Sequence, residues 1–184
     1  MEELLKEYIP YNEQEKKDKE VMLKYIKDFS NVYTRENEYG HFTASSWIVN
    51  KDKTKVLMIY HNIYDSWGWT GGHADGNENL YEVAIKEAKE ETSIDSLKPL
   101  YDGIYSIEIL TVDGHVKRGK YVSSHVHLNI TYLFEADDLA PLKIKEDENS
   151  GVKWVDIKDA VDISTENNMK VVYQKLIDKL DEVK

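Results

Sequence analysis

Residues 67–94 read WGWTGGHADGNENLYEVAIKEAKEETSI, and the rest of the chain is interpreted around this stretch. Three glycines at residues 71–76 indicate a shaped loop, because glycine costs conformational entropy unless the backbone needs positive φ or a close approach. Residues 80–92 contain no Gly or Pro, and Asn77 is a suitable N-cap. The stretch therefore predicts a glycine-rich loop that leads into a helix.

The predicted helix ends in a cluster of acidic side chains. Glu87 and Glu91 continue the edge of its apolar stripe, and Glu90 lies three residues after Glu87. Three carboxylates on about one turn repel one another, and the negative end of the helix dipole adds to the repulsion. Lys86 and Lys89 relieve part of it. A divalent cation would relieve more, and carboxylate oxygens suit Mg²⁺ or Mn²⁺ better than zinc. The alternative is a solvated, Glu/Lys-rich helix end.

This stretch resembles the Nudix hydrolase signature. In that signature a Gly is followed by five residues, a Glu, seven residues, Arg-Glu, an apolar residue, any residue, Glu-Glu, any residue, a Gly and an apolar residue. The residues in register with it are Gly72, Glu78, Glu87, Ala88, Glu90, Glu91 and Ile94. Lys86 stands where the family has Arg, which keeps the charge but loses the bidentate fork. Ser93 stands where the family has Gly, which loses an easy left-handed helix stop. Neither change removes a carboxylate.

The resemblance implies an α+β Nudix fold, with a mixed β-sheet sandwiched between helices (α/β/α) and an extra N-terminal helix. Residues 1–37 are expected to form a helical segment that packs on a single Nudix domain, residues 38–184. The hydrophobic patterns predict helices over residues 1–10, 12 or 13–29 and 165–183, and strands over 41–49, 55–60, 100–112, 120–136 and 152–157. Residues 62–69 are expected to be a loop, and Asp113-Gly114 a hairpin turn.

The resemblance also implies roles for individual residues. The family hydrolyses diphosphates with Mg²⁺, for which Mn²⁺ can substitute. The implied metal ligands are the Gly71 carbonyl, Glu87, Glu90 and Glu91. Lys86 and Glu78 would pair and brace the loop against the helix. Either Glu148, in the loop before the last strand, or one of Glu90 and Glu91 would take the proton of the attacking water, with Glu146 as a reserve.

Four residues around the stretch are candidates for contact with the substrate. His61 ends the second strand, where several family members have a basic residue that contacts phosphate. Trp67 and Trp69 could stack on a base, although at least one is expected to pack under the loop. His125 and His127 are two residues apart and face the same side of a strand. With no third ligand or Cys near this pair, we expect His127 to line the substrate pocket or to be hydrogen-bonded in the sheet, rather than to bind zinc.

Composition limits what the chain can do. With 184 residues, 41% of them hydrophobic, one domain with a real core is expected. The absence of Cys excludes disulfides, thiolate metal sites and cysteine chemistry. The N-terminus is too charged for a signal peptide and no apolar run is long enough to span a membrane, so a cytoplasmic location is expected. The net charge of −11 argues against a nucleic acid polymer as partner but permits a small nucleotide.

Two further surfaces are left open by the sequence. His115, Lys117, Arg118 and Lys120 form a compact basic group, which is either an exposed hairpin tip or a contact for phosphate or a partner. The apolar stripe of the closing helix belongs either to the core or to a homodimer surface.

The expected activity is Mg²⁺-dependent hydrolysis of a diphosphate bond, either in a nucleoside diphosphate linked to another group or in a (d)NTP. The alternative is a catalytically silent Nudix domain that senses a nucleotide. An isopentenyl-diphosphate isomerase is disfavoured, because those enzymes use a catalytic Cys and this chain has none. The sequence motifs that distinguish known Nudix subgroups are missing after the signature, so the sequence does not identify the substrate.

Overall fold

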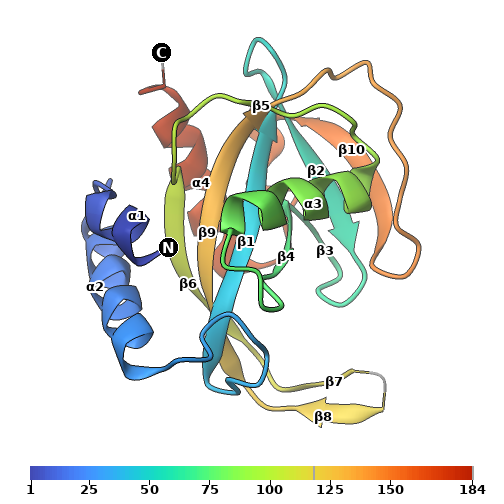
Figure 1. The fold of residues 1–184 in the computed structure, drawn as a ribbon. Coiled ribbons are helices and arrows are strands. Elements are labelled where there is room, and N and C mark those ends of the chain that lie inside the picture. Colours follow the sequence, from blue (N-terminus) through green and yellow to red (C-terminus); the bar gives the residue numbers. More distant parts are fainter. Residues whose placement is uncertain (118, 184) are drawn as a thin grey trace.

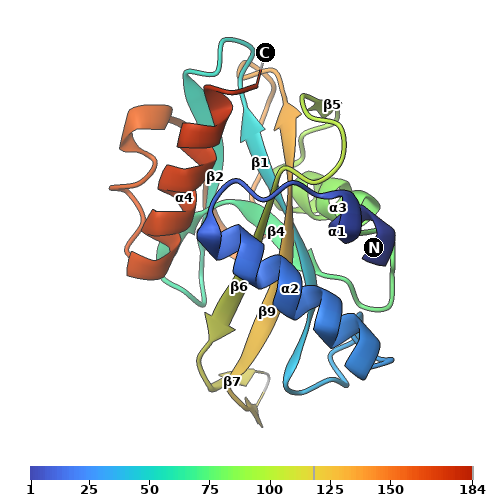
Figure 2. The same cartoon turned by 90° about the vertical axis from the view of Figure 1, so that its left-hand side faces the viewer.

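A mixed, curled β-sheet runs through the molecule between helices. The computed structural model describes residues 1–117 and 119–183, without the side chain of Lys117. Helix α3 (Leu80–Thr92) covers one face of the sheet and α4 (Asn167–Leu180) the other, as Figures 1 and 2 show. The expected α/β/α architecture is confirmed, including the extra N-terminal helix.

Two helices precede the sheet, and ten strands are present in the described residues. The helices are α1 (Glu2–Glu7) and α2 (Glu13–Asp28), and a 3-10 helix, η1, covers Ile157–Asp159. The strands are β1 (Gly40–Val49), β2 (Lys55–His61), β3 (Ser66–Gly68), β4 (Thr70–His73), β5 (Lys98–Pro99), β6 (Ser106–Val112), β7 (His115–Lys117), β8 (Lys120–Val122), β9 (His125–Glu135) and β10 (Asn149–Asp156).

Strand β1 is the centre of the sheet. The order across the main sheet is β10-β2-β1-β9-β5, with β3 on β2, β4 on β1 and β6 on β9. Strands β1 and β9 run parallel from Gly40↔Val126 to Val49↔Glu135, and the other pairs are antiparallel. All ten residues of β1 are buried, because helices cover both faces.

Alternate residues of β1 supply two separate cores. Phe42 and Ala44 belong to the apolar cluster under α3. Trp47 and Val49 belong to the cluster under α4, where the Trp47 ring lies 5.5 Å from the ring of Tyr173. Apolar packing therefore stabilises the sheet on both of its faces.

Buried ion pairs join the N-terminal helix to the C-terminal helix. Figure 2 shows α2 crossing in front of β6 and β9. Glu15 of α2 is fully buried, and its carboxylate lies 3.1 Å from Lys175 Nζ and 2.9 Å from Lys179 Nζ of α4. The Tyr8 hydroxyl also donates to Glu15, at 2.5 Å. Buried charges need such partners, so α2 is bound to the sheet by charge as well as by apolar contact.

Several sequence predictions are corrected. Only residues 106–112 of the predicted strand 100–112 belong to β6, because Gly103 turns the chain at a φ of +85°. The predicted strand 120–136 breaks into β8 and β9, and Asp113-Gly114 is not the hairpin turn: β7 and β8 pair with each other in a separate sheet. The loop at residues 62–69 contains β3, and part of the glycine-rich loop is strand β4. The other predicted helices and strands are confirmed to within a few residues.

The predicted N-cap Asn77 is also wrong. Asn79 caps α3, and its side chain accepts the N–H of Glu82 at 3.4 Å. Asn77 lies two residues earlier, and its side chain accepts the N–H of Asn79 at 2.9 Å. The turn at Gly76, with a φ of +91°, delays the start of the helix. Among the described residues, no helix is long and apolar enough to cross a membrane.

Replacing Glu15 with Gln is expected to destabilise the fold by about 3 kcal/mol, because Lys179 would stay buried without a carboxylate partner and Lys175 would keep only Glu108. Urea denaturation of the variant measures this loss. Glu13→Gln is the matched control, since Glu13 pairs with Lys16 on the exposed side of the same helix. Its effect should stay within about 0.5 kcal/mol. Equal effects of the two substitutions would contradict the proposed role of the buried pairs.

The ion pairs of Glu15 also predict how the stability of the fold depends on pH. Burial alone would raise the pKa of Glu15, but Lys175 and Lys179 outweigh it and lower the pKa from 4.5 to about 2. A lowered folded-state pKa stabilises the fold above the ordinary pKa, and this stabilisation is lost as the pH falls through the folded pKa. The stability gap between wild type and Glu15→Gln should therefore shrink as the pH falls below 4.5. A constant gap in denaturation curves over that range would contradict the assignment.

Candidate active site

Two glycines of β4 allow the strand to fit between β1 and the acidic end of α3. A Cβ on Gly72 would lie 2.6 Å from Cδ of Glu87, and one on Gly71 would lie 2.7 Å from the Ala44 carbonyl. Both positions therefore require glycine because of close approach rather than positive φ. With no side chain in the way, the Gly71 N–H donates to Oε2 of Glu91 at 3.0 Å.

Glu91 is the deepest of the acidic residues. Glu91 is only 2% exposed, whereas Glu87 is half-buried and Glu90 is exposed. The Asn149 side chain donates to the Glu91 carbonyl at 3.0 Å and connects this end of α3 to β10. The predicted stripe edge is confirmed for Glu91 and Glu87, and it directs the two carboxylates inward.

The helix stops at Ser93, where the signature has Gly. Ser93 adopts the left-handed conformation, with φ 60° and ψ 19°, and its N–H donates to the Lys89 carbonyl at 2.8 Å. A side chain in this region is strained, so the helix end keeps its geometry at a cost.

Ser93→Gly is expected to stabilise the protein by about 0.5–1 kcal/mol, because glycine adopts the left-handed conformation without strain. Glu82→Gly is the matched control: Glu82 is exposed inside the same helix, and the substitution should destabilise by about 1 kcal/mol. Thermal unfolding measures both. A Ser93→Gly variant less stable than wild type would contradict this account of the helix end.

Two lysines lie between the carboxylates. Lys86 Nζ is 3.3 Å from Glu87 and 3.4 Å from Glu90. Lys145 Nζ is 3.2 Å from Glu90 and 3.0 Å from Glu148. Lys145 was missed by sequence reasoning, because it lies in a charged loop with no pattern of its own. The loop brings Glu148 to the acidic end of α3, as expected from its position before the last strand.

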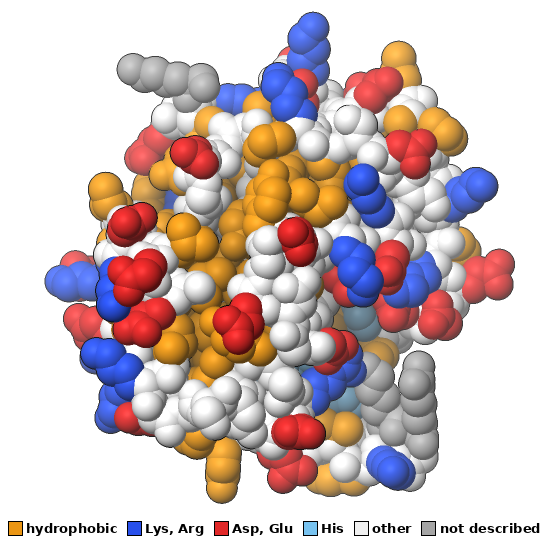
Figure 3. All heavy atoms as spheres, in the orientation of Figure 1, with side chains coloured by type: hydrophobic (Ala, Val, Ile, Leu, Met, Phe, Trp, Pro, Cys, Tyr) orange, Lys and Arg blue, Asp and Glu red, His pale blue; other side chains and the backbone are white. Residues whose placement is uncertain are grey.

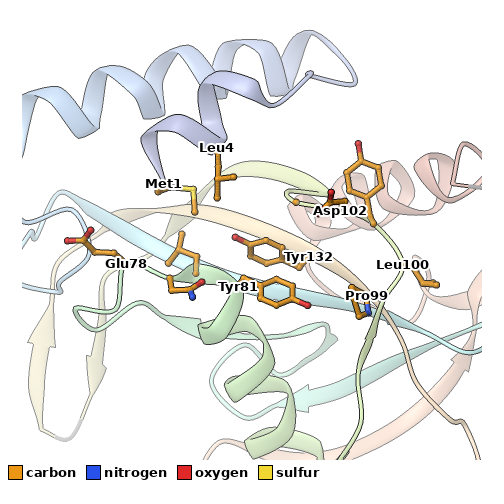
Figure 4. A pocket seen from close by; sticks show the side chains of 12 residues that line it. Met1, Leu4, Glu78, Tyr81, Pro99, Leu100, Asp102 and Tyr132 are labelled. Atoms are coloured by element: carbon orange, nitrogen blue, oxygen red, sulfur yellow. The ribbon is translucent and has the colours of Figure 1, made fainter.

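The expected brace between Lys86 and Glu78 is not formed in the structure, where Lys86 pairs with Glu87 and Glu90. Glu78 instead lines a cavity of about 510 Å³ near the start of α3. Figure 4 shows this cavity between α1, the start of α3 and the aromatic pair Tyr81 and Tyr132. The acidic residues at the other end of α3 do not line it.

Burial and like charge change the acidity of the cluster. Burial raises the pKa of Glu91 to about 8; the Gly71 N–H opposes this and the charges of Glu87 and Glu148 add to it. Burial also raises the pKa of Glu87, against the effect of Lys86. For Glu90 burial acts in the same direction, but the hydrogen bond from Lys145 and the charge of Lys86 outweigh it and lower the pKa. The most buried carboxylates thus lack enough positive charge around them.

The donor set fits a hard divalent cation. Carboxylate oxygens of the three helix residues and the backbone oxygen of Gly71 are ligands that Mg²⁺ and Mn²⁺ accept. The raised pKa of Glu91 means that its charged form is under-neutralised by the protein alone. A cation next to these carboxylates would supply that missing charge.

The aromatic residues before β4 differ in their surroundings. Trp69 contacts Tyr173 of α4, with ring centres 5.6 Å apart, and packs against the core under α4. The Trp67 ring has Lys153 Nζ 4.1 Å from its centre. His61 ends β2 opposite Asn149, the residue after Glu148, and its ring lies 4.6 Å from that of Tyr64.

His127 lies in a group of four histidines, which corrects the expectation that no third ligand is near the His pair. His41, His73, His125 and His127 offer ring nitrogens that all lie within 4.8 Å of one another. Burial lowers the pKa of His127 to about 2, and the neighbouring His73 and His41 add to the shift, so this ring is neutral.

The basic residues at positions 115–120 are described only in part. Arg118 and the side chain of Lys117 lie outside the described residues, and His115 is half-buried in β7.

Comparison with known proteins fits this geometry. A family model described as the NUDIX domain matches residues 40–176. The chain belongs to the Nudix family. It is a Nudix pyrophosphohydrolase, and proteins of this family typically use a divalent metal ion.

Relatives of this Nudix chain span most of its length. It is 28% identical over 140 residues to an RNA pyrophosphohydrolase of Pelagibacter ubique (strain HTCC1062), covering 74% of this chain and 88% of the relative. A Nudix family hydrolase from Clostridium perfringens is 25% identical with a TM-score of 0.52, covering 76% and 97% of the two chains. The E. coli dihydroneopterin triphosphate pyrophosphohydrolase shares the fold, with 17% identity, a TM-score of 0.54, and 74% and 94% coverage.

Proposed function

We propose that this Nudix enzyme hydrolyses a phosphoric anhydride bond of a small nucleotide in a Mg²⁺-dependent reaction at the acidic end of α3. One observation carries the proposal: Glu91 is buried, and its carboxylate is held by the N–H of Gly71 at 3.0 Å. A protein buries an under-neutralised carboxylate at a cost, which suits a site whose charge is completed by a bound cation.

Four groups would hold the metal: the Gly71 carbonyl, Glu87, Glu90 and Glu91. When bound, Mg²⁺ neutralises charge on the diphosphate oxygens and makes a water more acidic, and Mn²⁺ would substitute for it. The close contact of Gly72 with Glu87 supports this set, because it fixes the strand against the helix side chains. In place of the expected contact with Glu78, Lys86 would balance the charge of Glu87 and Glu90.

Glu148 would take the proton of the attacking water, and Glu90 and Glu91 are the alternatives for this role. Its loop hydrogen-bonds to the end of β2, where the Asn62 N–H donates to the Glu148 carbonyl at 3.1 Å. Lys145 lies between Glu148 and Glu90, so it would supply a positive charge beside the reacting phosphate.

Substrate contacts would come from side chains at the end of β2 and around β3. Trp67 and Trp69 both pack against the core under α4, so both stay candidates for stacking on a base. His61 is the last residue of β2, pairs with Asn149 next to Glu148, and would contact phosphate. His127 was the fourth candidate, and its burial among three other histidines favours a different role for it.

A small substrate is favoured over an RNA end. The Pelagibacter relative is named an RNA pyrophosphohydrolase. This chain, however, carries a net charge of −11, and Figure 3 shows acidic and basic side chains interleaved on the face that carries α3. Binding a polymer through its phosphates depends on a basic footprint, whereas a small nucleotide depends on the metal and a few side chains.

A substrate panel tests the reaction class. We expect purified protein with Mg²⁺ to hydrolyse at least one of these: dNTPs including oxidised ones, nucleotide sugars, ADP-ribose, dinucleoside polyphosphates or NADH. Phosphate release and chromatography of the products measure it, with EDTA as the control. Activity confined to a 5′-triphosphate RNA would contradict the small-substrate proposal, and activity that resists EDTA would contradict the metal requirement.

Glu91→Gln tests the site. The amide keeps the shape and can still accept the Gly71 N–H, but it cannot carry the charge. We expect kcat to fall by at least about 100-fold. Glu82→Gln is the matched control on the same helix, exposed in its first turn, and should leave kcat unchanged. Wild-type turnover by a folded Glu91→Gln variant would place the catalytic centre elsewhere.

A further inference from the structure

Three strands bring four histidines to one place outside the acidic cluster. His41 lies on β1, His73 on β4, and His125 and His127 on β9. His41 and His127 are paired residues of the parallel strands, and His73 pairs with Thr43, two residues after His41. Neighbouring rings lie 4.8–5.3 Å apart between centres. Residues from β1, β4 and β9 meet here only in the folded chain, so the cluster is a product of the fold.

Backbone carbonyls fix two of the rings. His41 Nδ1 lies 3.1 Å from the Asn37 carbonyl, and His125 Nδ1 lies 2.9 Å from the Ser123 carbonyl. A carbonyl accepts, so each Nδ1 carries the proton and each Nε2 keeps a lone pair. This is the outer-shell arrangement that orients histidines which bind a metal through Nε2.

Nε2 of His41 needs a partner. The residue is only 4% exposed, and its Nε2 is buried without a hydrogen bond among the described residues. His41 is one of the four histidines that each offer a ring nitrogen within 4.8 Å of the others. A buried acceptor with no partner is unfavourable, and an electron-pair acceptor in the middle of the four rings would satisfy it.

The spacing of the nitrogens suits a tetrahedral ion. The Nε2 atoms of His125 and His127 are 3.2 Å apart. Two ligands at the Zn–N distance in a tetrahedral shell are about 3.3 Å apart. All four ligand nitrogens lie within 4.8 Å of one another, so small rotations of the other rings would bring them to the same spacing. The competing explanation is a hydrogen bond from His127 to His125.

We propose that His41, His73, His125 and His127 bind one transition-metal ion, with Zn²⁺ as the best fit. Imidazole nitrogens suit zinc, and this set contains no carboxylate that would favour Mg²⁺. Four protein ligands fill a tetrahedral shell, which is the pattern of a structural site rather than a catalytic one.

The site would hold β4 in place. Gly72 faces Glu87 of α3, and its neighbour His73 points to the opposite face of the sheet. A metal at His73 would join β4 to β1 and β9 one residue away from the two glycines that contact the acidic end of α3. The ion would therefore stabilise the active-site geometry from the other side of the sheet.

Zinc binding by the full-length protein tests the proposal. The protein is treated with a chelator, dialysed into excess Mg²⁺ to occupy the carboxylate site, and titrated with Zn²⁺ in a calorimeter. We expect one Zn²⁺ per chain, a higher Tm with Zn²⁺, and the visible spectrum of tetrahedral Co²⁺ when Co²⁺ replaces it. Absence of tight Zn²⁺ binding by the wild type would overturn the proposal, whatever the variants do.

Variants locate the site. His125→Ala and His41→Ala should each weaken Zn²⁺ binding by at least about 100-fold, since even loss of an outer-shell partner costs 10–100-fold. His115→Ala, outside the cluster, and Glu91→Gln, in the acidic site, should bind Zn²⁺ as the wild type does. His125 is half-buried whereas His41 is buried, so loss of His125 should disturb folding less than loss of His41, and circular dichroism checks each variant. Unchanged binding in His125→Ala and His41→Ala, or equal loss in His115→Ala or Glu91→Gln, would overturn the proposal.

Discussion

The approach of β4 to the end of α3 is the contact on which the site depends. Gly72 can lie this close to the Glu87 side chain, and Gly71 this close to β1, only because neither residue has a Cβ. The approach places the Gly71 N–H on the buried carboxylate of Glu91. The two cores on either side of β1 keep the strand and the helix in this relation.

Charge balance explains the parts of the chain that packing does not. The protein places Lys86 and Lys145 among the carboxylates at the end of α3, and Lys175 and Lys179 around Glu15 on the opposite side of the sheet. The Glu15 group is balanced within the protein and binds the N-terminal helix to the domain. The α3 group is balanced only in part, because Glu91 keeps a raised pKa. This difference separates a structural charge cluster from one that suits a cation.

Local sequence patterns predicted the helices and the central strands well, because apolar periodicity and a short signature determine them. They failed where distant segments decide the structure. Asn77 and Asn79 are both good caps, and the turn at Gly76 selects the second. The break of the strand before His125 follows from the separate β7–β8 pairing. His41 and His73 lie far from the His125–His127 pair in sequence, so no spacing rule could join them, and Lys145 reaches Glu90 through the same kind of long-range contact.

Two metal sites on opposite faces of β4 would make this strand the element that connects stability with catalysis. The acidic site on the α3 side depends on hard oxygen ligands, and the histidine group on the other side depends on nitrogen ligands. The central claim concerns the first of these and is tested most directly by anomalous diffraction from crystals grown with Mn²⁺. The account predicts an anomalous peak bounded by Glu87, Glu90, Glu91 and the Gly71 carbonyl. A fully soaked crystal with no peak there, or with Mn²⁺ only at the histidines, would contradict it.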